Sequence, residues 1–155
     1  MRRRLAPILL ALACAASHAA CARSHTGGAV GAGGAGGARE ADRGTDGLVP
    51  ALNAFTEELT AKVESAADTK AGVAEAQRLL DSRGPEMAGR IDAFRKSPRG
   101  QEPAAKALWL EAEVDNTQRV RQLQLKYLDA SMRDPGLKAG LERLAADYDS
   151  LFGAR

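Results

Sequence analysis

Cysteine and histidine are scarce in this sequence of 155 residues, which contains two of each. All four lie within the first 25 positions, so residues 48–155 contain neither residue type. This absence excludes from that part of the chain catalytic sites built on Ser-His-Asp or Cys-His, zinc sites with nitrogen and sulfur ligands and Glu-x-x-His di-iron sites. A haem attached through a Cys-x-x-Cys-His motif is excluded as well. We therefore expect no enzymatic activity and no cofactor.

Aromatic residues are also few, at 4% of the chain, and β-branched residues are sparse, whereas alanine is abundant. This composition favours helices over sheets. Residues 48–155 have the length of one small domain. The sequence thus predicts an all-α fold for this part of the chain.

The folded part also lacks an excess of charge of one sign. Six of the 22 Lys and Arg residues and two of the 20 Asp and Glu residues lie in residues 1–45, which leaves 16 bases and 18 acids in residues 46–155. Binding of nucleic acid requires a basic face that displaces counterions from phosphate. The nearly neutral domain therefore argues against a nucleic-acid partner.

No hydrophobic run is long enough to span a membrane. The longest apolar run covers 12 residues, 5–16, whereas a spanning helix needs about 20. Arg2, Arg3 and Arg4 precede this run, and small residues follow it. A charged start, a short apolar run and a small-residue exit are the three parts of a secretory signal peptide. We therefore expect the chain to be exported.

The end of this signal offers two cleavage sites. Ala19, Ala20 and Cys21 resemble the lipobox of bacterial lipoproteins, although His18 stands where that family usually has Leu. The resemblance covers only residues 1–21 and implies that Cys21 carries a lipid, which anchors the protein to a membrane facing the periplasm or the cell surface. The alternative is cleavage after Ala22, which would release a soluble periplasmic or secreted chain.

A segment rich in Gly and Ala follows the signal. Residues 22–47 lack both periodicity and an apolar cluster, so they cannot bury enough surface to offset the entropy of ordering. We expect a flexible, disordered tether with a typical reach of roughly 25–30 Å.

Capping residues, prolines and apolar spacing predict four helices after the tether. They cover about 48–66, 69–96, 102–132 and 135–152. Pro85 either kinks the second helix or divides it into two collinear helices, and the unbroken apolar phase favours the kink. Because tight turns join the helices, we expect an up-and-down antiparallel bundle of three to four helices with coiled-coil-like packing.

Apolar residues at spacings of three and four define the faces that we expect to be buried. The predicted core positions are Leu48, Leu52, Phe55, Leu59 and Val63 in the first helix; Val73, Ala76, Leu80, Met87, Ile91 and Phe94 in the second; Ala107, Leu110, Val114, Thr117, Arg121 or Val120, Leu125, Leu128 and Met132 in the third; and Leu137, Leu141, Leu144, Tyr148 and Leu151 in the fourth.

Four residues of the third helix are candidates for a functional role. Trp109 lies one residue from the predicted seam and either covers the edge of the core or anchors a partner. Arg121 falls on the seam and either extends its charge into solvent or sets the register of an interface. Glu111 and Asp115 are four residues apart, as paired catalytic acids could be, but acid–base spacing of this kind is typical of solvated helix faces.

The leading hypothesis is a non-enzymatic lipoprotein of the cell envelope that acts through contacts with an envelope protein. Self-association into a homo-oligomer is compatible with the same hypothesis. The alternatives are a soluble periplasmic chaperone of the holdase type, which binds unfolded chains on an apolar face, and a secreted helical binding protein.

Overall fold

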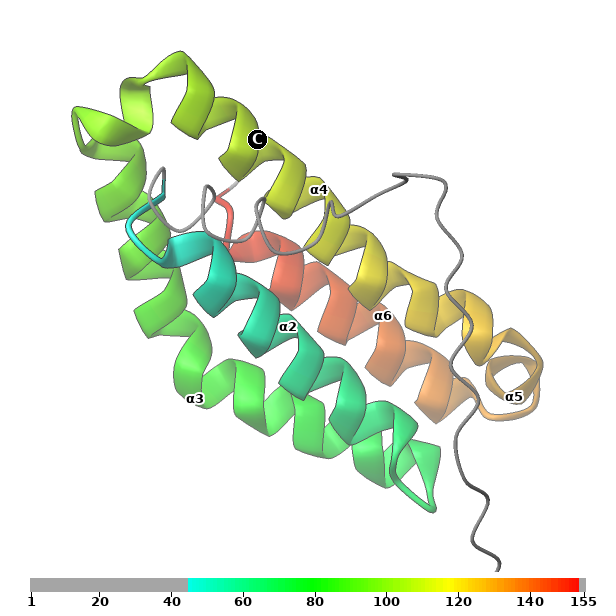
Figure 1. The fold of residues 1–155 in the computed structure, drawn as a ribbon. Coiled ribbons are helices and arrows are strands. Elements are labelled where there is room, and N and C mark those ends of the chain that lie inside the picture. Colours follow the sequence, from blue (N-terminus) through cyan, green and yellow to red (C-terminus); the bar gives the residue numbers. More distant parts are fainter. Residues whose placement is uncertain (1–44, 154–155) are drawn as a thin grey trace, which may run out of the picture. The chain divides into compact units, whose positions relative to one another are not determined.

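The computed structural model describes residues 45–153, and within this range every regular element is a helix. The predicted all-α fold is therefore confirmed. The expected signal peptide of residues 1–21 and most of the expected tether, 22–47, lie outside the described residues. The elements in chain order are α2 (Leu48–Glu64), α3 (Thr69–Lys96), the 3-10 helix η1 (Arg99–Gln101), α4 (Pro103–Lys126), α5 (Leu128–Arg133) and α6 (Pro135–Ser150) (Figure 1).

The four long helices α2, α3, α4 and α6 pack as a bundle in which each has two neighbours (Figure 1). α2 packs against α3 and α4, and α6 packs against the same two helices. Successive long helices run in opposite directions, as the sequence predicts. However, α3 and α4 lie at opposite corners, because the connection through η1 crosses the end of the bundle. A simple up-and-down bundle would instead place each helix beside the next one in the chain.

Polar contacts show that α2 and α4 are parallel neighbours. Asn116 Nδ2 donates a hydrogen bond to Asn53 Oδ1 at 2.6 Å, and Lys126 Nζ lies 2.7 Å from Glu64 Oε1. Residue numbers rise together along the two helices from the first contact to the second. The connection after α3 crosses to the opposite corner of the bundle. It therefore places α4 beside α2, and the two helices run in the same direction.

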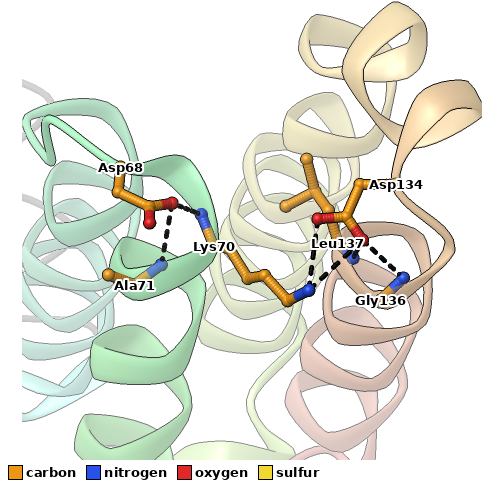
Figure 2. Close-up of polar contacts among 6 residues, drawn as sticks. All are labelled: Asp68, Lys70, Ala71, Asp134, Gly136 and Leu137. Atoms are coloured by element: carbon orange, nitrogen blue, oxygen red, sulfur yellow. Dashed lines mark hydrogen bonds and ion pairs between the residues drawn. The ribbon is translucent and has the colours of Figure 1, made fainter.

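Figure 2 shows the starts of α3 and α6, which lie side by side. Asp68 accepts hydrogen bonds from two backbone amides at 2.8 and 3.4 Å, and Asp134 accepts two at 2.8 and 3.1 Å. Asp68 and Asp134 are therefore the N-caps of α3 and α6. Lys70 Nζ reaches 3.2 Å from Asp134 and joins the two helix starts. The backbone hydrogen bond from Leu137, and after it Lys70, lowers the pKa of the Asp134 carboxyl below its ordinary value.

α3 is one continuous helix through Pro85, which confirms the expected single helix over 69–96. The helix changes direction along its length (Figure 1), which is the usual consequence of a proline that lacks its amide hydrogen and crowds the preceding turn. Gly84 is buried beside Leu151 of the C-terminal segment, which comprises α6 and the residues after it up to 153. A β-carbon at Gly84 would lie 3.2 Å from the Leu151 side chain.

The third predicted helix, over 102–132, is divided in the structure. It ends at Lys126, and after Tyr127 a separate short helix, α5, covers Leu128–Arg133. Tyr127 has φ −105° and ψ 21°, which is outside the helical region and interrupts the axis. The start of this helix is as predicted, with Pro103 in its first turn.

The core contains every residue that the sequence predicts to be buried in α2, α3 and the C-terminal segment. At one end of the bundle, aromatic side chains from three elements meet. The Trp109 ring lies 5.9 Å from that of Phe94 and 6.0 Å from that of Phe152 between ring centroids. The Phe152 ring in turn contacts Tyr148 at 5.6 Å. These contacts join α3, α4 and the C-terminal segment.

Candidate functional site

The face that α4 buries is not the one that the sequence predicts. Most of the predicted seam is exposed, and of its positions on α4 only Val120, one of the two alternatives given with Arg121, is buried. α4 therefore carries two stripes with helical spacing, and the more apolar one faces solvent. The buried residues of α4 are Ala105, Trp109, Ala112, Glu113, Asn116, Val120 and Leu123.

Two polar residues, Glu113 and Asn116, make the buried stripe of α4 difficult to recognise. Glu113 is 2% exposed, and its Oε2 accepts a charge-assisted hydrogen bond from Arg95 of α3 at 2.9 Å. The same guanidinium donates to the carbonyl of Phe152 at 2.5 Å and lies 5.8 Å from the centroid of the Trp109 ring. Arg95 thereby compensates the buried carboxylate and connects α3, α4 and the C-terminal segment.

Asn116 is fully buried between α4 and α2. Its amide nitrogen donates to Asn53 of α2 at 2.6 Å and to the carbonyl of Ala112 at 2.7 Å. These hydrogen bonds reduce the cost of burying the amide. A polar residue can therefore occupy a core position that an apolar pattern assigns to the surface.

Because polar residues occupy the core face of α4, the apolar residues of the predicted seam form an exposed surface on α4 and α5. Among residues 45–153, every exposed large hydrophobic side chain belongs to these two helices. Leu125 is 73% exposed and Met132 is 76% exposed. We call this surface the outer stripe, and it comprises Leu110, Val114, Thr117, Arg121, Leu125, Leu128 and Met132.

A groove of about 550 Å³ borders the outer stripe on the side of α6. Val114, Thr117 and Arg121 line it from α4, and Asp149 and Phe152 line it from the C-terminal part of the chain. Arg121 Nη2 lies 2.5 Å from Asp149 Oδ2, so an ion pair crosses the groove. Both partners are partly solvated, which makes this pair a weak contributor to stability.

The structure separates the two candidate residues that the sequence singles out. Trp109 is 2% exposed and belongs to the core, which is one of its two expected roles, whereas the other, contact with a partner, requires an exposed ring. Arg121 is exposed and lies on the outer stripe, so it is available to a partner. The exposed apolar residues around Arg121 are functional candidates that the sequence assigns to the core.

The carboxylates of α4 form no enclosed site with one another. Glu111 and Asp115 are both exposed, whereas Glu113 faces the core. In the part of the chain that the structure describes, no three residues of the His, Cys, Asp or Glu type are grouped so that they could hold a metal ion. Within residues 45–153, none of the helices combines the length and apolar character needed to cross a membrane.

The fold and the site define the protein as a four-helix bundle with an exposed apolar stripe. No family model, curated protein or solved structure matches the chain. The chemistry of the outer stripe therefore carries the functional argument.

Proposed function

We propose that this protein is a non-enzymatic lipoprotein of the cell envelope that acts through protein–protein contacts at its outer stripe. The outer stripe is the observation that carries the proposal. Exposed large apolar side chains grouped on a folded domain are typical of an interaction site, because their transfer out of water is favourable. Residues 1–21 support the placement in the envelope, with Cys21 as the lipidated residue.

The spacing of the stripe supports a helical partner. From Leu110 to Leu125, all on α4, its members are separated by steps of four and three residues. This is the spacing with which one helix presents a seam to another. A lipid surface is a poorer match, because an interfacial helix usually has a strongly basic polar face. Here the charged residue of the stripe, Arg121, is already paired with Asp149.

Site-specific photocrosslinking in cells that export the chain tests the contact. A photoreactive residue in place of Gln118, which is exposed beside the stripe, should give discrete protein adducts. The same residue in place of Ala93, exposed on α3, is the matched control and should give few. Absence of adducts from position 118, or equal adducts from both positions, would contradict the proposed function.

Lipidation is tested by cell fractionation. In the Cys21→Ala variant no thiol remains at the position that would receive the lipid, so the protein should move from the membrane fraction to the soluble fraction. A substitution of the neighbouring Arg23, Arg23→Ala, leaves that thiol in place and should not change the fractionation. A wild-type protein that is already soluble would favour the periplasmic or secreted alternative instead.

A further inference from the structure

A surface groove between α3 and α6 contains no residue of the outer stripe. The two helices run in the same direction, because Lys70 contacts Asp134 and, further along both helices, Gln77 contacts Asp147. Two cavities of about 380 and 360 Å³ follow one another between the helices and meet at the contact of Gln77 with Asp147. Residues within 70–78 and 136–143 line the first cavity, and residues within 80–88 and 147–151 line the second. We call the two cavities together the seam groove.

The two halves of the seam groove carry opposite charges. The half nearer the helix starts is lined by Lys70, Arg78 and Arg143, and none of the described residues that line it is acidic. The other half is lined by Asp81 and Asp147, and none of its described residues is basic. The groove therefore changes from basic to acidic in the chain direction of α3 and α6.

One charge in each half is available to a partner. Lys70 and Arg143 are each paired with an aspartate at 3.2 Å. Arg78 and Asp81 are exposed, and neither has an ion-pair partner among residues 45–153. The Asp81 carboxylate accepts one hydrogen bond, from Gln77 at 2.9 Å. Because Arg78 and Asp81 are three residues apart on α3, the two charges lie within about one helical turn.

Small residues line the seam groove and leave room for a helix. Ala74, Gly136 and Gly140 lie in the basic half, and Gly84 and Ala88 lie in the acidic half. Small side chains at a contact let helix axes approach closely. From residue 70 to residue 88 the groove follows about 27 Å of α3, which is the length of roughly five helical turns. The shape therefore fits one amphipathic helix laid along the groove.

We propose that the seam groove binds a partner helix that runs antiparallel to α3 and α6. A basic side chain of this helix faces Asp81, and an acidic side chain three or four residues later faces Arg78. The helix dipoles favour the same direction. The starts of α3 and α6 lie side by side (Figure 2), so the negative C-terminal end of an antiparallel helix lies beside their positive ends. This second contact surface goes beyond the proposed function and does not depend on the outer stripe.

Fluorescence anisotropy with a designed peptide tests the charge pattern. The probe is an alanine- and leucine-based helix of about 18 residues, which carries one Lys and, four residues later, one Glu. Its control carries Gln at both positions. The protein is the full chain with Cys21→Ala, so that no lipid contributes. The probe should bind at roughly 10–100 μM, since one helix forms a small interface, and the control about five- to tenfold more weakly.

A charge reversal in the protein tests the assigned residues. Arg78→Glu should weaken binding of the probe by about tenfold, because an attraction becomes a repulsion. A second peptide with Lys in place of the Glu should bind Arg78→Glu more tightly than it binds the wild type. The matched control Arg90→Glu changes an exposed cation of α3 outside the groove and should leave binding unchanged. Equal binding of the probe and the Gln control, or equal losses in both variants, would overturn the proposal.

Paramagnetic labels on the probe test its direction. A nitroxide at the C-terminus of the bound probe should broaden the backbone amide signal of Gly136, and a nitroxide at its N-terminus should broaden that of Ala88. The reverse pattern would overturn the antiparallel direction.

A membrane is the other occupant that the basic half could attract. Binding of the wild type to vesicles of anionic phospholipid that Arg78→Glu abolishes, without binding of the probe up to about 1 mM, would overturn the partner helix. These results leave the proposed function to its own test, because the crosslinking position 118 lies beside the outer stripe and outside the seam groove.

Discussion

At the scale of single residues, Tyr148 is the largest fully buried side chain among residues 45–153. Its side chain is fully buried, and its ring stacks on Phe55 of α2 with 6.5 Å between centroids. The hydroxyl lies 2.5 Å from Thr56 Oγ1, which also donates to the carbonyl of Leu52 at 2.9 Å. The Tyr148 hydroxyl thus has a hydrogen-bond partner in Thr56, and the side chain connects α6 to α2 across the bundle. Burial raises the pKa of this hydroxyl to about 12.

This raised pKa predicts a loss of stability at high pH. The unfolded chain releases the Tyr148 proton near pH 10, whereas the folded chain keeps it to about pH 12. The contribution is therefore complete below pH 10, and the free energy of unfolding should fall by up to roughly 3 kcal/mol between pH 10 and 12. Tyr148→Phe should remove this part of the decline in urea titrations at several pH values.

A matched control is available because the chain has two tyrosines. Tyr127 is only half-buried, so Tyr127→Phe should keep the alkaline decline. Tyr148→Phe should also cost about 1 kcal/mol at neutral pH through the lost hydrogen bond with Thr56. Parallel pH profiles for the wild type and Tyr148→Phe would contradict the assignment.

At the scale of elements, the close approach of α3 to α2 depends on Gly72. A β-carbon at Gly72 would lie 2.6 Å from the carbonyl oxygen of Lys62 and 2.7 Å from the β-carbon of Ala66. Backbone on one side and a short side chain on the other leave little freedom to adjust. The two helices can therefore approach this closely beside their connecting turn only because residue 72 has no side chain.

Gly72→Ala should lower the free energy of unfolding by roughly 1–3 kcal/mol, the usual cost of overpacking. Gly89 in the same helix is the matched control, since a β-carbon there would meet nothing within 4 Å. Gly89→Ala should raise the free energy of unfolding by about 0.5–1 kcal/mol, because alanine is the better helix former. Chemical denaturation of the two variants measures both effects, and equal effects would refute the close-approach argument.

The accuracy of the sequence prediction differs between elements for a physical reason. α2, α3 and α6 each have a single apolar stripe, so their boundaries and buried faces can be read from spacing and caps. α4 has two stripes: the outer stripe, and the buried stripe described above, which we call the inner stripe. Hydrophobicity selects the outer stripe, with Leu110, Val114 and Leu125, instead of the inner stripe, which contains Glu113 and Asn116. The inner stripe is buried because Arg95 lies where it can pair with the Glu113 carboxylate and Asn53 lies where it can accept a hydrogen bond from the Asn116 amide nitrogen. Only the tertiary structure brings these partners to α4.

At the scale of the whole molecule, the order of neighbours determines which surface is free. α4 lies between α2 and α6, diagonally opposite α3. These two neighbours, together with Phe94 and Arg95 near the end of α3, cover the inner stripe of α4 and leave the outer stripe in solvent. A bundle with α4 beside α3 would bury a different face, so the candidate interaction surface is a property of the bundle topology.

Composition and local pattern determine the helical class and the start of each long helix. These features depend on residues close together in the chain: caps such as Asp68 and Asp134, prolines, and the spacing of apolar side chains. Only the tertiary structure determines that α3 and α4 lie at opposite corners of the bundle, that Trp109 is buried and that the outer stripe is exposed. Those outcomes depend on contacts between distant residues, above all Arg95 with Glu113, which make a partly polar helix face the more favourable one to bury.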